Sequence, residues 1–366
     1  LAEPGGEPLL PPTLGGLIAA QVDALDPASK GALQIAATIG LSFSAALVAE
    51  AAGLDQPAVL LRDLVDSGLI MPEGEGAYSF SSHLVWQVVR RSILGVQLRD
   101  HHRLVAEGIE RLHADRLGAW AEALSGHCAA CGRHLDAARY ANQAGDQHRD
   151  AAFLERALAC FRRGIDWLET AAGLEDEPDA NLRGEAMLHL KAGEVALMMG
   201  HTQDAERHLQ VALDLADAGM FSDIESRCFL ALGRLYMANG KLVLAEANLD
   251  QGRASTRDPA LSVEFLVEQA ALACARGEYD QAERQLAQAA GLAGDDAGLI
   301  ARSKLGLANR YLRDDRPEVA WKLLDEARGS AQASGDRILL GRVLNNLGIA
   351  RYTLEDYTGA LAWFRQ

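Results

Sequence analysis

The chain has 366 residues, of which 49% are hydrophobic and 5% aromatic, and its formal net charge is −16. The hydrophobic fraction excludes a disordered chain, and the acidic balance disfavours non-specific nucleic-acid binding because such a surface repels phosphates. No apolar run reaches the roughly 18 residues of a membrane span, and no secretory signal opens the sequence. We therefore expect a cytoplasmic protein with no membrane contact and five reduced cysteines. Because the sequence starts at Leu1 and stops within a repeat, we interpret it as an excerpt of a longer polypeptide.

The first part of the chain predicts a linker and a small domain. Residues 1–12 are rich in proline and glycine and are expected to form the linker. Residues 13–82 predict three helices followed by one β-hairpin, which is the order of a winged-helix domain. Asp26 has the residue type of a helix N-cap, and Pro27 that of the first helical position.

The third helix of this domain, predicted at 56–67, is the one that winged helices often place in the major groove of DNA. It carries Arg62 but also Asp63 and Asp66. From residue 13 to the end of this helix, six acidic residues outnumber two basic ones. Phosphate contacts need the opposite sign, so we expect no direct nucleic-acid binding.

Residues 83–117 predict two connecting helices that are rich in arginine and histidine. The basic positions are Arg90, Arg91, Arg99, His101, His102 and Arg103. These residues either contact a neighbouring acidic domain or phosphates, or form a solvated helix face.

Residues 118–178 predict irregular helical repeats, and they contain the sequence His127-Cys128-x-x-Cys131-x-x-His134. The residue types are those of a zinc site, which requires four converging ligands. The cysteines lie on a predicted helix, and no second cysteine pair is present. We therefore favour helix packing and predict no metal.

Residues 179–366 contain a regular repeat. Five alanines mark it at intervals of 40, 37, 38 and 40 residues: Ala205, Ala245, Ala282, Ala320 and Ala360. A large apolar residue stands four positions after each alanine, and a glycine stands five positions before three of them. Glycine or alanine also recurs twelve positions before each marker. A unit of this length predicts two antiparallel helices that must stack on neighbouring units to bury their apolar faces. The predicted fold is therefore all-α.

The predicted array offers a groove on its concave side, lined by the first helix of each pair. Counting from the recurrent glycines assigns six polar residues to this lining: Arg227, Arg234, Arg302, Asn309, Arg342 and Asn345. Guanidinium and amide groups bind carboxylates and peptide backbone well. The hypothesis is a groove for a protein or peptide partner, and the alternative is an ordinary solvated helix surface.

The sequence shows no catalytic constellation and no phosphate-binding loop of the type G-x-x-x-x-G-K-[ST]. We therefore predict that this chain is not an enzyme and holds no cofactor itself.

Two resemblances follow from these patterns. The repeats resemble tetratricopeptide repeats, although the period exceeds the usual value of about 34 residues. The match is carried by Leu232-Gly233-x-x-Tyr236-x-x-x-Gly240-x-x-x-x-Ala245-x-x-x-Leu249 and by Leu347-Gly348, Tyr357, Ala360 and Phe364. The front part is similar to the segment after the nucleotide-binding domain in bacterial STAND-class signalling ATPases. That match is carried by Leu64-Val65-x-x-Gly68-Leu69-Ile70 and Tyr78-x-Phe80-x-x-His83.

The STAND resemblance implies a role for His83. In that class, a histidine just after the winged-helix hairpin reaches the phosphates of the nucleotide on the neighbouring domain. It also implies a regulatory module that restrains an adjacent nucleotide-binding domain and binds a partner on its repeats. ATP or ADP would then belong to a parent protein that is an ATPase or a nucleotide cyclase. The alternatives are the sensor half of a DNA-binding activator whose DNA reader lies outside this chain, and a stand-alone repeat scaffold.

Overall fold

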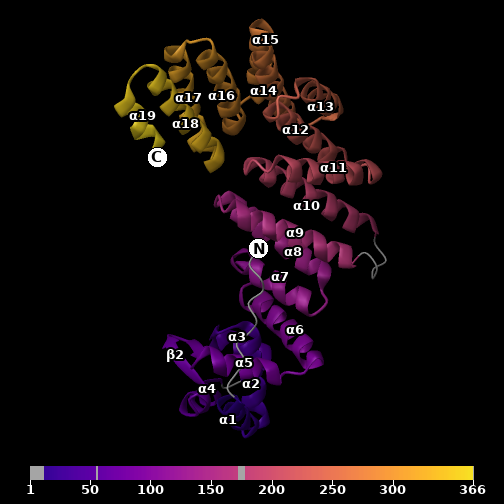
Figure 1. Cartoon of the computed structure of the whole chain (residues 1–366), viewed down its shortest axis with the longest axis vertical. Helices are drawn as coiled ribbons and strands as arrows, with labels where there is room; N and C mark the ends of the chain where they lie inside the picture. The colour runs from indigo at the N-terminus through magenta and orange to yellow at the C-terminus, as the bar shows by residue number, and fades with distance from the viewer. Residues whose placement is uncertain (1–11, 55–56, 172–177, 366) are drawn as a thin grey trace. The chain divides into compact units, whose positions relative to one another are not determined.

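The computed structural model describes residues 12–54, 57–171 and 178–365 (Figure 1). Within these ranges the chain is helical apart from one small sheet, which confirms the all-α prediction. None of the described helices combines the length and the apolar character that crossing a bilayer requires. The predicted linker lies outside the described residues except for Pro12, and so do Asp55 and Gln56.

The chain forms two compact units. Unit 1 comprises residues 1–144 and 167–171, and unit 2 comprises residues 145–166 and 172–366.

Unit 1 begins with the small domain that carries the sheet. Its elements are α1 (Pro12–Asp23), α2 (Pro27–Ile39), β1 (Ser42–Ser44), α3 (Ala45–Ala52), α4 (Pro57–Asp66), β2 (Ile70–Gly74) and β3 (Ala77–Phe80). Asp26 caps α2, as predicted, by accepting hydrogen bonds from the backbone N–H groups of Ala28 and Ser29. Leu33, Val48 and Leu64 are among the side chains that fill the core.

The sheet has three antiparallel strands in the order β1-β3-β2, one strand more than the predicted hairpin. Ser42 pairs with Ser79 on one side of β3, and Ile70 pairs with Phe80 on the other. Strand β1 was missed because three residues are too few to show an alternating pattern. The observed order is α2, β1, α3, α4, β2 and β3, so a strand interrupts the predicted series of helices before the hairpin, and the winged-helix assignment stays a prediction.

The rest of unit 1 is helical. It contains α5 (His83–Ser92), α6 (Gly95–Leu112), the 3-10 helix η1 (Leu117–Trp120), α7 (Ala121–Ala130) and the first part of α8 (His134–Asp150). A second core cluster joins these helices to α3 through Leu47, Ile109, Leu124 and Cys128, all of which are buried. Burial of large apolar side chains of this kind contributes about 1.5–3 kcal/mol each.

Unit 2 is a row of helical hairpins that continues from the end of α8 and from α9 (Leu154–Ala171). The hairpins are α10 (Pro178–Met198) with α11 (Thr202–Ala218), α12 (Ser222–Ala238) with α13 (Leu242–Ser255), α14 (Pro259–Arg276) with α15 (Tyr279–Ala293), α16 (Ala297–Arg313) with α17 (Pro317–Ser334), and α18 (Arg337–Thr353) with α19 (Tyr357–Phe364). Each first helix packs on its own second helix and on the first helix of the next hairpin. The five marker alanines are all buried.

The two helices of a hairpin interlock through a small residue and a large one sixteen positions later. A Cβ atom added to Gly233 would lie 2.5 Å from Leu249 Cδ2, and one added to Gly193 would lie 2.7 Å from Leu209 Cγ. The same close fit occurs between Gly348 and Phe364. It also occurs between Gly145 and Phe161 in the stretch that the sequence suggested was irregular. The repeat therefore begins earlier than its regular spacing indicated.

The turns inside the hairpins share one backbone conformation. Gly200, Gly240 and Gly277 have φ between 71° and 80°, as the recurrent glycines predicted. In three other hairpins the equivalent residue also has positive φ but is not glycine: Ala152, Asp315 and Glu355. After each turn, a backbone N–H bonds to the carbonyl five residues back, for example from Lys241 to Tyr236. This is the Schellman pattern of helix C-termini.

The interlock predicts opposite effects for two glycine-to-alanine substitutions. Gly233→Ala should destabilise unit 2 by about 1–3 kcal/mol, because the new methyl group overpacks against Leu249. Gly291→Ala, in α15 with no atom within 4 Å of the added Cβ, should stabilise it by about 0.5 kcal/mol. Urea unfolding followed by circular dichroism measures both, and equal effects of the two substitutions would contradict the interlock.

Candidate functional site

A groove of about 1160 Å³ runs along unit 2 and is lined mainly by the first helices α10, α12, α14, α16 and α18. Four of the six residues predicted for the partner groove line it: Arg227, Arg234, Arg302 and Arg342. Asn309 lines a smaller recess beside it. Asn345 lines neither cavity; it is exposed, and its Nδ2 donates to Asn346 Oδ1 at 3.4 Å. Whether these residues contact a partner stays a prediction.

The groove arginines connect the first helices of successive hairpins. Arg227 of α12 donates to Glu194 of α10 at 3.2 Å. Arg234 of α12 bonds to two acids of α14, Glu264 at 2.9 Å and Glu268 at 2.7 Å.

The series continues beyond α14. Arg302 of α16 lies 3.2 Å from Glu264 and 3.0 Å from Asp336, the N-cap of α18. We call this set of pairs the ion-pair ladder; its members are Glu194, Arg227, Arg234, Glu264, Glu268, Arg302 and Asp336.

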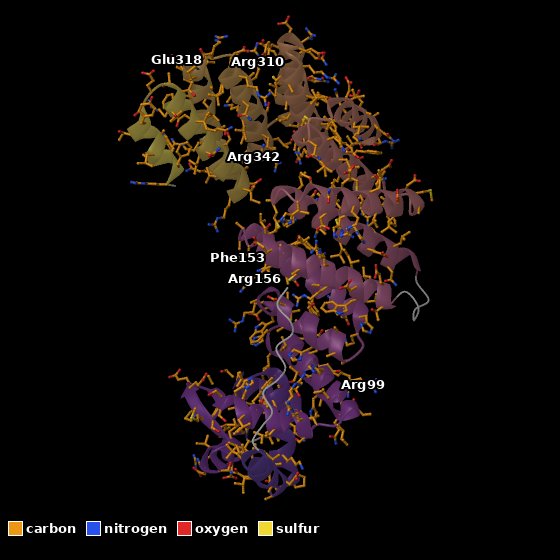
Figure 2. All side chains as sticks on the ribbon, in the orientation of Figure 1. Arg99, Phe153, Arg156, Arg310, Glu318 and Arg342 are labelled. Carbon is orange, nitrogen blue, oxygen red and sulfur yellow. The ribbon has the colours of Figure 1, made fainter. Side chains whose placement is uncertain are left out.

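The groove lining combines charged and apolar side chains. Seven arginines and five carboxylates line it, so its balance is positive although the whole chain carries a charge of −16. The larger apolar side chains of the lining are Leu197, Met198, Leu230, Met237, Leu242, Leu261 and Ile338. In Figure 2 the labelled Arg342 lies on the inner side of the row of hairpins. The groove can therefore offer both apolar contacts and charged hydrogen-bonding groups to one ligand.

A recess of about 30 Å³ opens beside the groove and shares five lining residues with it: Arg234, Glu264, Glu268, Arg302 and Arg342. The surrounding atoms partly desolvate the Arg342 guanidinium, and this desolvation lowers its pKa, although the residue as a whole is exposed. Among the residues the structure describes, no ion pair or hydrogen bond involves Arg342.

The acids of the ladder were missing from the sequence prediction. Glu264 occupies the repeat position, eighteen residues before the marker alanine, that Arg227 and Arg302 occupy in the adjacent hairpins. Glu194 shares a different repeat position with Arg234. Counting by repeat position, rather than by residue type, would have found these acids, because opposite charges at equivalent positions of stacked helices indicate ion pairs.

His83 is the first residue of α5, directly after β3, with Ser82 as the N-cap. It is exposed, and its ring lies 5.2 Å from the ring of Trp86. Trp86 is itself anchored by a 3.0 Å hydrogen bond from Nε1 to the carbonyl of Ala37. A helix N-terminus favours anions, so the location suits a phosphate contact. The nucleotide role itself stays a prediction.

The predicted basic cluster on α5 and α6 is not one continuous solvated face. His102 is buried, and its Nδ1 lies 2.8 Å from Nδ1 of His127 on α7. Desolvation lowers the pKa of both imidazoles to about 4. Arg103 instead pairs with Asp100 and Glu107 along its own helix.

The residues of the His127-to-His134 motif do not converge on one point. Cys128 packs in the core, where burial raises the pKa of its thiol to about 12, and metal binding would need the thiolate. The Cys131 thiol donates to the Cys128 carbonyl at 3.3 Å. These contacts favour the packing interpretation of the motif.

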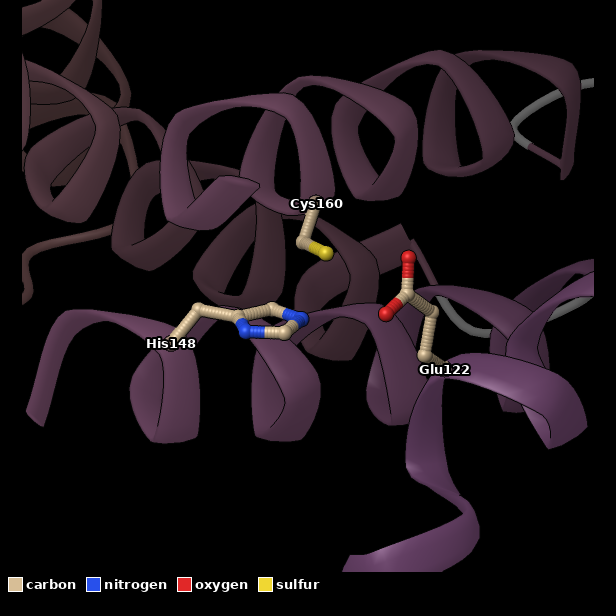
Figure 3. Close-up of side chains that lie close together, drawn as sticks. All are labelled: Glu122, His148 and Cys160. Carbon is tan, nitrogen blue, oxygen red and sulfur yellow. The ribbon is translucent and has the colours of Figure 1, made fainter. Parts of the chain in front are cut away.

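A cysteine and a histidine also meet in unit 2. Figure 3 shows the side chains of His148 on α8 and Cys160 on α9 directed toward one another. Glu122, the third residue drawn, belongs to unit 1. Two ligands from one unit are too few for a structural zinc site, which needs four, so we assign no function to this contact.

A second histidine pair lies inside the first regular hairpin. His189 of α10 and His208 of α11 are buried, with their Nδ1 atoms 2.9 Å apart. Arg207 Nη2 lies 3.1 Å from His208 Nε2, and a guanidinium can only donate. His208 therefore carries its proton on Nδ1 and donates it to His189, so both rings are neutral.

The pair predicts a pH-dependent stability of unit 2. Desolvation lowers the pKa of both rings from 6.5 to about 4. The charges of His208 and Arg207 lower the pKa of His189 further. Those of Arg207 and Arg162 lower the pKa of His208 further, and Asp204 opposes that shift. Between these pH values the unfolded chain binds more protons than the folded chain. The free energy of unfolding should therefore fall as the pH drops from 6.5 to 4, by about 1.4 kcal/mol per pH unit for each histidine.

His208→Gln should reduce the dependence of the unfolding free energy on pH by about 1.4 kcal/mol per pH unit, the contribution of one histidine. His201→Gln, at an exposed position, is the matched control and should leave the slope unchanged. Urea unfolding at a series of pH values from 7 to 4 measures it. Equal slopes in the wild type and the His208 variant would show that the pair is not neutral when folded.

Known structures resemble this arrangement of helices. No protein-family model matches the chain, and no curated protein matches it either. A Rap protein solved in complex with Competence and Sporulation Factor aligns over 96% of each chain, with a TM-score of 0.53 and 13% identity. Aspartyl phosphate phosphatase F from Bacillus subtilis aligns over 85% of this chain and 79% of its own, with a TM-score of 0.50 and 12% identity.

A STAND protein with a tetratricopeptide repeat sensor from Pyrococcus horikoshii also aligns, over 98% of this chain and 59% of its own. Its TM-score is 0.42 at 13% identity, and we base no argument on it. At these identities the likeness concerns the fold alone. The chain has a tetratricopeptide-like helical-repeat fold.

Proposed function

We propose that the chain is a non-catalytic regulatory module that binds a peptide, or an extended segment of a partner protein, in the groove of unit 2. The observation that carries this proposal is the groove of about 1160 Å³, whose lining combines apolar and charged side chains. This volume exceeds the roughly 300–1,000 Å³ of small-molecule sites, so a length of polypeptide suits it better.

The chemistry of the lining suits a peptide. Met198 and Met237 have flexible thioether side chains that adapt to apolar residues of different shapes. The paired arginines and glutamates keep further donors and acceptors for backbone groups. Because the ladder already fixes these side chains, ordering them costs little when a ligand binds.

The fold comparison is consistent with this role. The Rap protein that aligns with nearly the whole chain was solved with a bound partner, Competence and Sporulation Factor. We assign no reaction to the groove, because most of its carboxylates and four of its arginines are engaged in ion pairs rather than left as acid, base or nucleophile.

The groove predicts that a large side chain on its wall blocks peptide binding. Ala275 is exposed and lines the groove. Ala275→Trp should therefore reduce the affinity for peptides selected from a phage-displayed random library by about tenfold or more. Ala287→Trp makes the same change at an exposed position of α15 outside the groove and should alter affinity less than about twofold. If no peptide is enriched, or if both variants behave alike, the groove is not the binding site.

The resemblance to STAND signalling ATPases supports a finer proposal. We propose that unit 1 contacts the nucleotide-binding domain of a cytoplasmic parent ATPase or nucleotide cyclase, and that His83 touches the phosphates of its ATP or ADP. The exposed ring at the N-terminus of α5 supports this role. A partner in the groove would then shift the equilibrium between restrained and active states. A DNA-binding activator with its reader elsewhere, or a stand-alone scaffold, remains the second candidate.

The nucleotide role predicts a nucleotide-dependent contact. The chain should co-purify with the parent's nucleotide-binding domain more strongly in one of the two states, ADP-bound or ATP-bound. His83→Ala should abolish that difference, whereas His113→Ala, in the loop after α6, should not. Equal retention with ADP, with ATP and without nucleotide would end the proposal.

A further inference from the structure

The charge pattern of the array is interrupted at one residue. At the position eighteen residues before the marker alanine, successive hairpins carry Arg227, Glu264, Arg302 and Arg342. The charge at this position alternates in sign from Arg227 to Arg302, but Arg342 in the last hairpin has the same sign as Arg302. Arg302 is already engaged with Glu264 and Asp336, so Arg342 meets no free carboxylate.

The groove around Arg342 carries more guanidinium groups than carboxylates, seven against five, although Glu268 and Glu264 attract the Arg342 guanidinium. Three guanidinium groups and two carboxylates line the recess, those of Arg234, Arg302, Arg342, Glu264 and Glu268. Both carboxylates are taken, because Glu268 accepts from Arg234 and Glu264 accepts from Arg234 and lies 3.2 Å from Arg302. An additional anion in the recess would therefore reduce the positive balance of the groove lining and meet a guanidinium that has no ion pair of its own.

The size of the recess limits the group that can enter. A volume of about 30 Å³ holds roughly two water-sized atoms, which matches the two oxygens of a carboxylate. Asn309 also lines the recess; its Oδ1 accepts from Asn346 at 2.5 Å, so its N–H groups remain as donors. A guanidinium and an amide are the pair of groups that hydrogen-bonds a carboxylate well.

The recess and the groove share lining residues on α12, α14, α16 and α18, so the recess lies beside the groove. The groove lining also includes Arg149 and Glu194, which do not line the recess. A peptide backbone can therefore lie in the groove while one of its side chains enters the recess.

We propose that Arg342 and Asn309 anchor the carboxylate of an aspartate or glutamate side chain of the peptide bound in the groove. This inference rests on the proposed function of the groove and names its ligand class, an acidic peptide with apolar flanking residues. The ladder arginines serve as a fixed frame, and Arg342 provides the specific contact.

The test uses an array of C-terminally amidated octapeptides of mixed apolar residues with one fixed central residue, either Glu or Gln. A third set keeps the central Gln but carries a free terminal carboxylate. The fluorescently labelled chain should bind the Glu set about tenfold more tightly than both Gln sets. Arg342→Gln should abolish this preference.

Arg337→Gln is the matched control, because Arg337 lies on the same helix and lines the same groove but not the recess. It removes the same charge and should keep the preference for Glu. Urea unfolding of both variants first confirms that they are folded, which we expect because Arg342 is exposed and makes no ion pair within the described residues.

The outcomes separate the two proposals. Equal binding of the Glu and Gln sets would overturn the anchor while leaving the groove as a peptide site. Tighter binding of the Gln set with a free C-terminus than of the Glu set would show that the recess binds the terminal carboxylate of a peptide. That result would overturn the proposal of a side-chain carboxylate. Equal losses in both arginine variants would indicate a general charge effect and also overturn it. Failure of every set to bind would overturn the anchor together with the peptide-binding function.

Discussion

The architecture depends on one steric fit, repeated along the chain. In four hairpins a glycine on the first helix faces a large apolar side chain on the second helix, sixteen residues later. Two further hairpins have alanine at the glycine position, in the same core cluster as the corresponding leucine. Because the small residue has little or no side chain, the two backbones approach closely and the large residue fills the remaining space. A hairpin made this way still has an exposed apolar face, so it is stable only when stacked on its neighbours. The row of first helices that lines the groove follows from this stacking.

The stacking also determines the electrostatics of the groove. Neighbouring first helices bring their polar residues within ion-pair distance, and Arg234 and Arg302 each bridge to an adjacent helix. These residues are only partly exposed, so their pairs are less screened than ordinary surface pairs. The result is a groove whose charged side chains are held in place before any ligand arrives. Arg342 lines the same groove but has no carboxylate partner in the ladder.

Much of the fold could be predicted from sequence, because the interlock needs particular residue types at fixed spacing. The glycine positions and the marker alanines could be recognised for this reason. The Asp26 cap could be predicted because aspartate before a proline is typical of a helix N-terminus. Strand β1 was too short to show an alternating pattern. The turn residues Ala152, Asp315 and Glu355 have positive φ, which their residue types do not predict. The groove arginines were predicted, but their partners were not, because acids spread over a helix surface look alike until stacking brings some of them opposite a guanidinium. The burial of His102 likewise depends on packing between helices that are distant in sequence.

The ladder has a consequence for how such an array can change length. From α10 to α18, the groove-lining charges that form the pairs alternate in sign from one hairpin to the next. Loss of the single hairpin α14–α15 by recombination would bring Arg234 opposite Arg302, and duplication of one hairpin would create a similar repulsion. Loss of α12–α13 together with α14–α15 would instead place Glu194 of α10 opposite Arg302 of α16, and opposite signs would stay in register. Loss of two adjacent hairpins can therefore preserve the ladder at this point of the array, whereas loss of the single hairpin α14–α15 cannot.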